Sequence, residues 1–158
     1  MRFFLVDRVD ELKPGEMIRG VKNVTLSEDF LQDHFPSHPL FPGTLMIEAL
    51  AQLGGCLVEA TFNTSDDNVR RAVLAQVDRA RFHEAVRPGD QLKIVCRLVS
   101  MLEGAAQVKG EASVGEREVA RATLLFALRA VGSERIHRQR REIYEIWTRH
   151  LNLDFTLR

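Results

Sequence analysis

The sequence has few cysteines and no excess of charge of either sign. Its two cysteines, Cys56 and Cys96, show no CxxC or metal-ligand spacing, so we expect reduced, buried thiols. Lys plus Arg and Asp plus Glu number 22 each, so no net field attracts nucleic acid or an anionic membrane. The balance of charge argues against a nucleic-acid partner.

Targeting signals are lacking as well. The chain reaches Asp7 and Arg8 before an apolar segment long enough for a signal peptide has formed. By inspection, no apolar stretch approaches the roughly 20 residues that a membrane span needs. We therefore predict a cytoplasmic protein without a membrane span.

Composition and length predict one globular core. Apolar residues make up 45% of the 158 residues and charged residues 28%, which is ordinary for a folded domain of this size. We expect a main domain over residues 1–131. A helical extension over 132–158 is expected to pack on the same domain or on a partner subunit.

The hydrophobic periodicity predicts an α+β domain with one long buried helix, expected over 44–60, and about five strands. Pro14-Gly15 and Pro88-Gly89 indicate turns. The spacing predicts a curved antiparallel sheet wrapped around the central helix. The expected strands span 4–9 (a short strand or an extended arm), 17–26 with a bulge, 69–82, 91–102, 105–114 and 118–131, and a short helical turn spans 27–32.

The C-terminal segment, from Ser133 to about Leu151, predicts an amphipathic helix with arginines on its polar face. Ser133 is the candidate N-cap. Packing on the sheet or a partner is the main interpretation, and binding of an anionic carrier or membrane is the alternative. The expected apolar stripe consists of Ile136, Ile143, Tyr144, Ile146, Trp147 and Leu151.

The most informative segment runs from His34 to Gln52 and reads HFPSHPLFPGTLMIEALAQ. His34 lies on a loop made rigid by prolines, and a histidine there suits a general base near neutral pH; a purely structural role is the alternative. His38 follows four residues later, but the prolines exclude a helical pair of metal ligands. We predict no metal site.

Two polar side chains, Glu48 and Gln52, lie one turn apart on the predicted apolar helix and so share a face. We expect Glu48 to be buried, and a buried carboxylic acid that keeps its proton can donate it to a leaving group. Gln52 can orient it by a hydrogen bond. The alternative is a buried ion pair between Glu48 and Arg79 or Arg81.

Gly43 stands where the predicted helix begins. The first amides of a helix lack intrahelical acceptors, and the helix dipole favours negative charge near them. Because glycine has no side chain, a substrate carbonyl can approach the Gly43 N–H closely. This amide is therefore a candidate donor to an oxygen that gains negative charge.

The order His-Phe-Pro-x-His-Pro-x-x-Pro-Gly-x-Leu-x-x-Glu-Ala-x-Ala-Gln resembles the signature of the (3R)-hydroxyacyl-acyl-carrier-protein dehydratases of the FabZ type, which have the hotdog fold. The resemblance covers about residues 3–130. Further similar segments are Phe4-Leu5-Val6-Asp7-Arg8-Val9, Lys22-Asn23-Val24-Thr25, Asp78-Arg79-Ala80-Arg81-Phe82 and Arg87-Pro88-Gly89-Asp90-Gln91-Leu92.

This resemblance implies roles for the motif. His34 would remove the α-proton, Glu48 would protonate the departing β-hydroxyl, and the Gly43 amide would bind the thioester carbonyl. The predicted substrate-binding residues are Phe35, Phe41, Leu45 and Gln52, the three apolar ones as candidate walls of an acyl tunnel, with packing in the core as the alternative.

The resemblance also implies a partner and an assembly. The substrate would be carried by acyl carrier protein in fatty-acid or related acyl-chain biosynthesis, and no cofactor is expected. The site would combine the histidine and the glutamate of different subunits in a homodimer, with a trimer of dimers as a common further assembly. A hotdog thioesterase and a non-catalytic acyl-binding hotdog subunit are the alternatives.

Three features depart from the family pattern. Ala85 stands where the family usually has proline, which is expected to loosen one turn. The start lacks the family's His-Arg-Tyr-Pro lead-in, so the N-terminal arm is expected to pack differently. The tail after about Val131 has no counterpart in the family, which leaves its role open.

Overall fold

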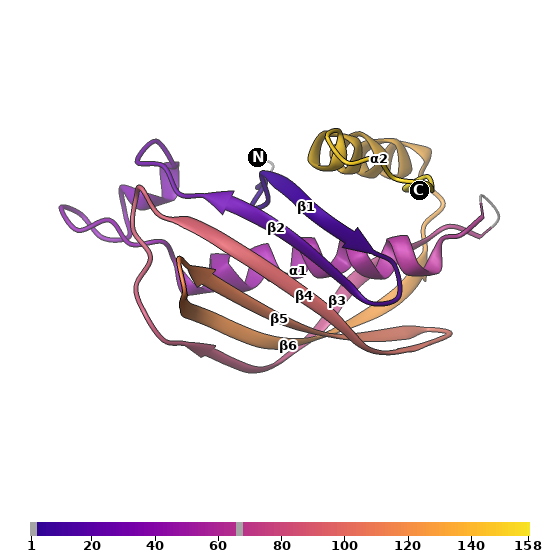
Figure 1. The fold of residues 1–158 in the computed structure, drawn as a ribbon, viewed down its shortest axis with the longest axis horizontal. Helices are drawn as coiled ribbons and strands as arrows, with labels where there is room; N and C mark the ends of the chain where they lie inside the picture. Colours follow the sequence, from indigo (N-terminus) through magenta and orange to yellow (C-terminus); the bar gives the residue numbers. More distant parts are fainter. Residues whose placement is uncertain (1–2, 66–67) are drawn as a thin grey trace.

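A six-stranded antiparallel sheet curves around one long helix in the computed structural model, which describes residues 3–65 and 68–158 (Figure 1). The strand order is β1-β2-β4-β5-β6-β3. The predicted α+β hotdog architecture with an extra C-terminal helix is confirmed. The elements are β1 (Arg8–Lys13), β2 (Met17–Asn23), the 3-10 helix η1 (Asp29–Leu31), α1 (Gly43–Phe62), β3 (Arg70–Phe82), β4 (Gln91–Leu102), β5 (Ala105–Val114), β6 (Arg117–Ala130) and α2 (Glu134–Thr148).

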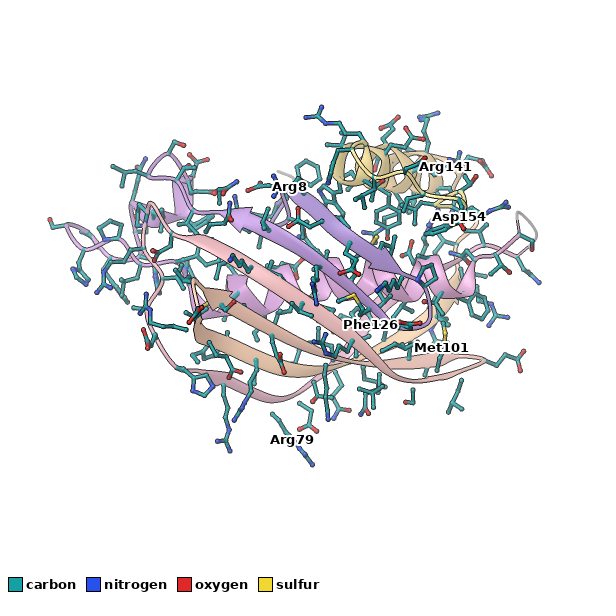
Figure 2. The ribbon with its side chains drawn as sticks, viewed as in Figure 1. Arg8, Arg79, Met101, Phe126, Arg141 and Asp154 are labelled. Atoms are coloured by element: carbon teal, nitrogen blue, oxygen red, sulfur yellow. The ribbon has the colours of Figure 1, made fainter. Side chains whose placement is uncertain are left out.

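The sheet packs on α1 because its inward-facing residues alternate with outward-facing ones. On β5, Val108 and Ala112 are buried, whereas Lys109 and Glu111 between them are exposed. Gly110 lets α1 approach closely, since an added Cβ would lie 3.1 Å from a methyl carbon of Leu50. The core thus lies between the concave face of the sheet and the helix, as the side-chain view shows (Figure 2).

The turns follow the predicted Pro-Gly pairs. Gly15 and Gly89 have φ of 81° and 97°, a region that favours glycine. The predicted hairpins joining β4 to β5 and β5 to β6 are present. β3 precedes β4 in the chain but does not pair with it. Instead, β3 pairs with β6 and forms one edge of the sheet.

The N-terminal region differs from the prediction of about five strands. Residues 3–6 form an extended arm, and a sixth strand, β1, begins only at Arg8. The bulge lies in β1, where the register shifts between Val9 and Glu11, rather than in β2. β2 ends at Asn23, and Leu26, expected within the strand, is 70% exposed.

Helix α1 has 20 residues and is long and apolar enough to pass as a membrane span by length and composition alone. The prediction that no apolar stretch approaches the length of a membrane span is therefore wrong. Most of the helix is buried inside the fold. A helix that is apolar on most sides is stable in water only when it is buried, and here the sheet buries most of its surface.

Helix α2 lies above β1, toward the C-terminal end of α1 (Figure 1). A buried ion pair lies beneath it, in which Arg71 Nη1 of β3 is 2.6 Å from Glu59 Oε2 of α1. Arg71 also donates to His137 Nδ1 of α2 and to the main-chain oxygen of Arg158. The buried guanidinium of Arg71 thus joins the extension to the core, and Arg140 of α2 adds a second contact, with its Nε 3.8 Å from Glu59 Oε1.

The apolar stripe predicted for the C-terminal helix is only partly correct. Tyr144 and Trp147 are buried, whereas Ile136 and Ile146 are 40% and 59% exposed. Ser133 is the N-cap, although its side chain makes no capping hydrogen bond; its main-chain oxygen accepts from the amides of Ile136 and His137. The helix packs through a narrower face than the sequence indicates.

The edge strand β3 is uncovered along most of its length. Only Arg71 and Ala72 near its start are buried, and every residue from Val73 to Phe82 is exposed. Four of these exposed residues are large and apolar: Val73, Leu74, Val77 and Phe82. A long exposed edge with apolar side chains is a typical place for strand pairing with another chain.

Candidate active site

His34 lies on the loop that precedes α1, and its ring is held by the loop's own backbone. Nδ1 is 2.8 Å from the carbonyl oxygen of Leu40. Because a carbonyl can only accept, Nδ1 carries the hydrogen of this bond, so the neutral tautomer compatible with it has its lone pair on Nε2. The ring also stacks on Phe35, with centroids 4.2 Å apart. This geometry leaves Nε2 as the basic atom.

Helix α1 begins at Gly43, one residue before the expected start. The first helical hydrogen bonds come from Leu45 and Met46, both to the carbonyl of Pro42. No hydrogen bond from the Gly43 N–H is found within residues 3–65 and 68–158. An added Cβ at Gly43 would lie 2.9 Å from a ring carbon of Phe82, so this aromatic ring approaches the glycine backbone directly.

His34 and Gly43 line the same open pocket of about 480 Å³. Phe82 at the end of β3 forms part of its wall, together with Phe41 and Met46. The pocket's other ionisable side chains are engaged elsewhere: His83 pairs with Glu118 at 2.9 Å, and Glu84 pairs with Arg117. The pocket therefore joins an available imidazole to the first amide of a helix.

Glu48 differs from its predicted environment, because its side chain is exposed in the single chain. The sheet covers the opposite side of α1 and α2 lies toward its C-terminal end, so a stripe near its N-terminus, with Thr44 and Glu48, is left open. The buried glutamate of this helix is Glu59, which sequence reasoning missed. Its partner is Arg71, not Arg79 or Arg81, both of which are exposed.

The predicted hydrogen bond between Gln52 and Glu48 is present, with Gln52 Nε2 donating to Glu48 Oε1 at 3.0 Å. The same amide also contacts the N-terminal arm. Gln52 Oε1 accepts from the Leu5 N–H, and Nε2 donates to the Phe3 carbonyl, each at 3.0 Å. No sequence signal indicated that this arm reaches the motif, since the contact spans 49 residues.

The three apolar candidates occupy different environments. Phe41 is buried, and its ring packs edge-on against Phe30 with centroids 5.4 Å apart. Leu45 is half-buried against the core, and Phe35 is 52% exposed beside His34. Of these, Phe41 alone lines the pocket that contains His34 and Gly43.

One chain does not bring all of the predicted site residues together. Glu48 and Gln52 are absent from the wall of the pocket that His34 and Gly43 line. They lie on the open stripe of α1, beside the N-terminal arm. His34 and Glu48 thus lie at two separate places on a single chain.

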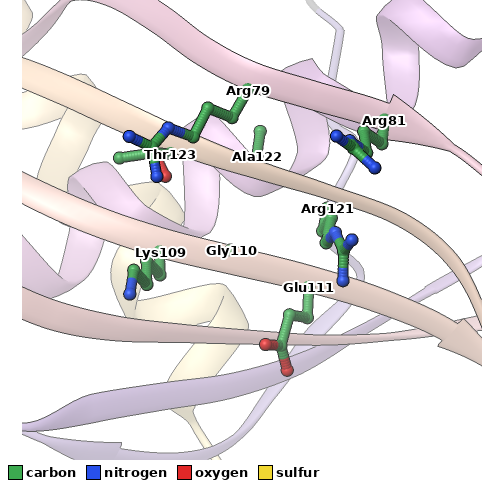
Figure 3. A pocket seen from close by; sticks show the side chains of 8 residues that line it. All are labelled: Arg79, Arg81, Lys109, Gly110, Glu111, Arg121, Ala122 and Thr123. Carbon is green, nitrogen blue, oxygen red and sulfur yellow. The ribbon is translucent and has the colours of Figure 1, made fainter.

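Another pocket lies on the outer face of the sheet and contains none of the predicted site residues (Figure 3). Its basic side chains are Arg79, Arg81, Lys109 and Arg121, with Glu111 among them. No group of three His, Cys, Asp or Glu residues that could hold a metal ion occurs in the described part of the chain.

Both cysteines are buried and free, as the sequence predicts. Burial raises the pKa of the Cys96 thiol to about 12, and burial also raises that of Cys56, with a further contribution from Glu59. Thiols in this state are unreactive. Neither is a candidate nucleophile.

Comparison with known proteins shows the family to which this chain belongs. A family model described as a FabA-like domain matches residues 1–123. A 3-hydroxyacyl-acyl-carrier-protein dehydratase FabZ of Halalkalibacterium halodurans is 42% identical over 127 residues, covering 80% of this chain and 89% of that protein. The FabZ of Thioalkalivibrio sulfidiphilus is 41% identical over 134 residues, covering 83% and 90%.

The chain belongs to the FabA-like family, and within it to the hotdog dehydratases of the FabZ type. Solved structures share the fold at lower identity. The dehydratase heterocomplex ApeI:P of Xenorhabdus doucetiae has a TM-score of 0.66 at 18% identity, over 86% of this chain and 89% of that one. The protein smu.793 of Streptococcus mutans, bound to acetyl CoA, has a TM-score of 0.64 at 19% identity, over 82% and 94%.

Proposed function

We propose that this protein dehydrates (3R)-hydroxyacyl thioesters of acyl carrier protein to trans-2-enoyl thioesters. The observation that carries the proposal is the pocket that His34, whose Nδ1 is held by the Leu40 carbonyl, lines together with Gly43 at the start of α1. The FabZ relatives, at about 40% identity over most of the chain, support the substrate class.

Each group then has one proton or charge to handle. Nε2 of His34 removes the α-proton, and the Gly43 N–H stabilises the negative charge that develops on the thioester oxygen. The β-carbon–oxygen bond breaks as the α,β double bond forms, and Glu48 gives its proton to the departing hydroxyl, which leaves as water. No electrons are gained or lost overall, so the reaction requires no redox cofactor.

The active site is proposed to form across a homodimer. Two observations support this assembly: His34 and Glu48 lie in separate half-sites of one chain, and β3 exposes its edge from Val73 to Phe82. Pairing of β3 with a second copy would bury the apolar residues of this edge. Assembly into a trimer of dimers and a cytoplasmic location belong to the same proposal.

Product analysis tests the function. The purified protein is incubated with a 3-hydroxyacyl thioester, and enoyl formation is followed by ultraviolet absorbance and by the mass loss of water. We expect the wild-type enzyme to form the enoyl thioester and both variants, His34→Ala and Glu48→Gln, to form none. Release of free thiol without enoyl product would instead indicate a thioesterase, and unreacted substrate at every chain length a non-catalytic subunit.

Mixing the two inactive variants tests the shared site. If each site takes His34 from one subunit and Glu48 from the other, a mixed dimer of His34→Ala and Glu48→Gln has one intact site. Co-refolding the two variants should therefore restore activity. Activity that stays absent in verified mixed dimers would show that both residues act within one chain.

A further inference from the structure

The N-terminal arm, residues 3–6, is joined to the acid half-site through a single amide group, that of Gln52. Gln52 Oε1 accepts a hydrogen bond from the Leu5 N–H, and Gln52 Nε2 donates to the Phe3 carbonyl. The same Nε2 donates to Glu48 Oε1, all three distances being 3.0 Å. Both hydrogens of the amide nitrogen and its oxygen are thereby used.

The arm determines which way the Gln52 amide faces. If the amide were rotated by half a turn, its nitrogen would meet the Leu5 N–H, and two donors would oppose each other. Its oxygen would then meet the Phe3 carbonyl and a Glu48 oxygen, so acceptors would oppose each other. With the arm in place, one orientation is compatible with every partner, and that orientation donates to Glu48.

This orientation also selects the protonated oxygen of Glu48. Because Oε1 already accepts the Gln52 N–H, the acid proton of a protonated Glu48 belongs on Oε2. We propose that the main chain of the N-terminal arm is a positioning element for the acid: it fixes the Gln52 amide and so directs the Glu48 proton toward the departing hydroxyl. This inference rests on the proposed dehydratase function.

The arm is anchored in a way that suits this role. Leu5 and Val6 are almost fully buried, and the Asp7 amide bonds to the Val21 carbonyl at 2.8 Å. Phe3 and Phe4 are 50% and 46% exposed, so their rings contribute less to the core. The backbone of the arm, rather than its aromatic side chains, makes the contacts to Gln52.

A truncation and a matched substitution separate backbone from side chain. The first variant lacks residues 2–4, so that Met1 is followed directly by Leu5, which removes the Phe3 carbonyl and keeps the buried leucine. The second, Phe3→Ala/Phe4→Ala, keeps the backbone and removes both rings. Steady-state kinetics use one 3-hydroxyacyl thioester, and thermal unfolding of each variant shows that it remains folded.

We expect the truncation to lower kcat about tenfold with KM unchanged, the fold-change that corresponds to one hydrogen bond of about 1.4 kcal/mol. The double alanine variant should keep kcat within about twofold of the wild type, as for exposed substitutions. A structural role alone would lower thermal stability and leave kcat of the folded enzyme intact.

A double-mutant cycle identifies the route of the effect. Gln52→Met removes the amide and should itself lower kcat, and the truncation should then cause no further loss in the Gln52→Met background. An unchanged kcat in the truncated enzyme, or an equal loss with and without Gln52, would overturn the proposal. Failure of the wild type to form enoyl product would refute the dehydratase function instead, so the two failures are distinguishable.

Discussion

Removing the charge of Glu59 should destabilise the protein strongly, although Glu59 lies outside the active site. The Glu59 and Arg71 side chains are 1% and 3% exposed, with 2.6 Å between Oε2 and Nη1. Oε1 also accepts the Ala72 N–H at 3.0 Å. Glu59→Gln keeps the size of the side chain and an acceptor for Ala72, but removes the carboxylate charge that lies 2.6 Å from the buried Arg71 cation.

The expected loss follows from this geometry. Breaking a buried pair by neutralising one partner costs about 3–5 kcal/mol. We expect about 3 kcal/mol, the lower end, because Arg71 keeps His137 Nδ1 and the main-chain oxygen of Arg158 as acceptors. For a chain of this length, about 2–4 °C per kcal/mol predicts a fall in Tm of about 6–12 °C.

Urea unfolding followed by the fluorescence of Trp147 measures this loss. Trp147 is the only tryptophan, is buried, and lies on α2, which Arg71 holds through His137. Glu145→Gln, on the exposed side of α2, is the matched control and should change stability by less than about 0.5 kcal/mol. A Glu59→Gln loss below about 1 kcal/mol would refute the assignment of this pair as the anchor of the extension.

Three further predictions concern the pocket, the edge strand and the thiols. Gly43→Ala should displace the Phe82 ring and lower kcat/KM by about 10²-fold, the order of loss caused by a misplacement of about 1 Å. Activity within twofold of the wild type would contradict the close contact between Gly43 and the Phe82 ring. Val77→Asp should weaken self-association, and activity should fall with the dimer fraction measured by sedimentation; an unchanged dimer would exclude β3 as the interface. Stability should decrease above about pH 8.5, because there the unfolded state releases the protons of both thiols, whereas burial raises the pKa of Cys96 to about 12 and also raises that of Cys56, so the folded state retains them. Urea midpoints at pH 7.5 and 9.5 check this, and Cys96→Ala should weaken the dependence without abolishing it, because Cys56 still contributes.

Local sequence patterns were sufficient to predict most secondary structure. The apolar periodicity of α1, the Pro-Gly turns and the alternation of β4 and β5 each arise from residues close together in the chain. The prediction was weaker at the N-terminus. There the sequence left a short strand and an extended arm as alternatives, and residues 3–6 form the arm, in which the Leu5 N–H and the Phe3 carbonyl bond to the Gln52 side chain.

In the candidate site, too, the features that depend on neighbouring residues were predicted, and those that depend on long-range packing were not. His34, Gly43 and Glu48 were identified from the spacing of one short segment, together with the bond from Gln52 to Glu48 across one helical turn. The exposure of Glu48 was missed. A helix that is apolar on most sides indicates burial on average, but it does not show which stripe the sheet and α2 leave open.

The sequence by itself thus determined the local chemistry: a histidine on a rigid loop, a glycine at a helix start, and an acid one turn before an amide. Only the tertiary structure decided that Glu59 rather than Glu48 is buried with an arginine, that β3 lies at the open edge, and that the N-terminal arm reaches Gln52. The physical reason is distance along the chain. Periodicity and capping act over a few residues, whereas these contacts depend on how the whole sheet curves around α1.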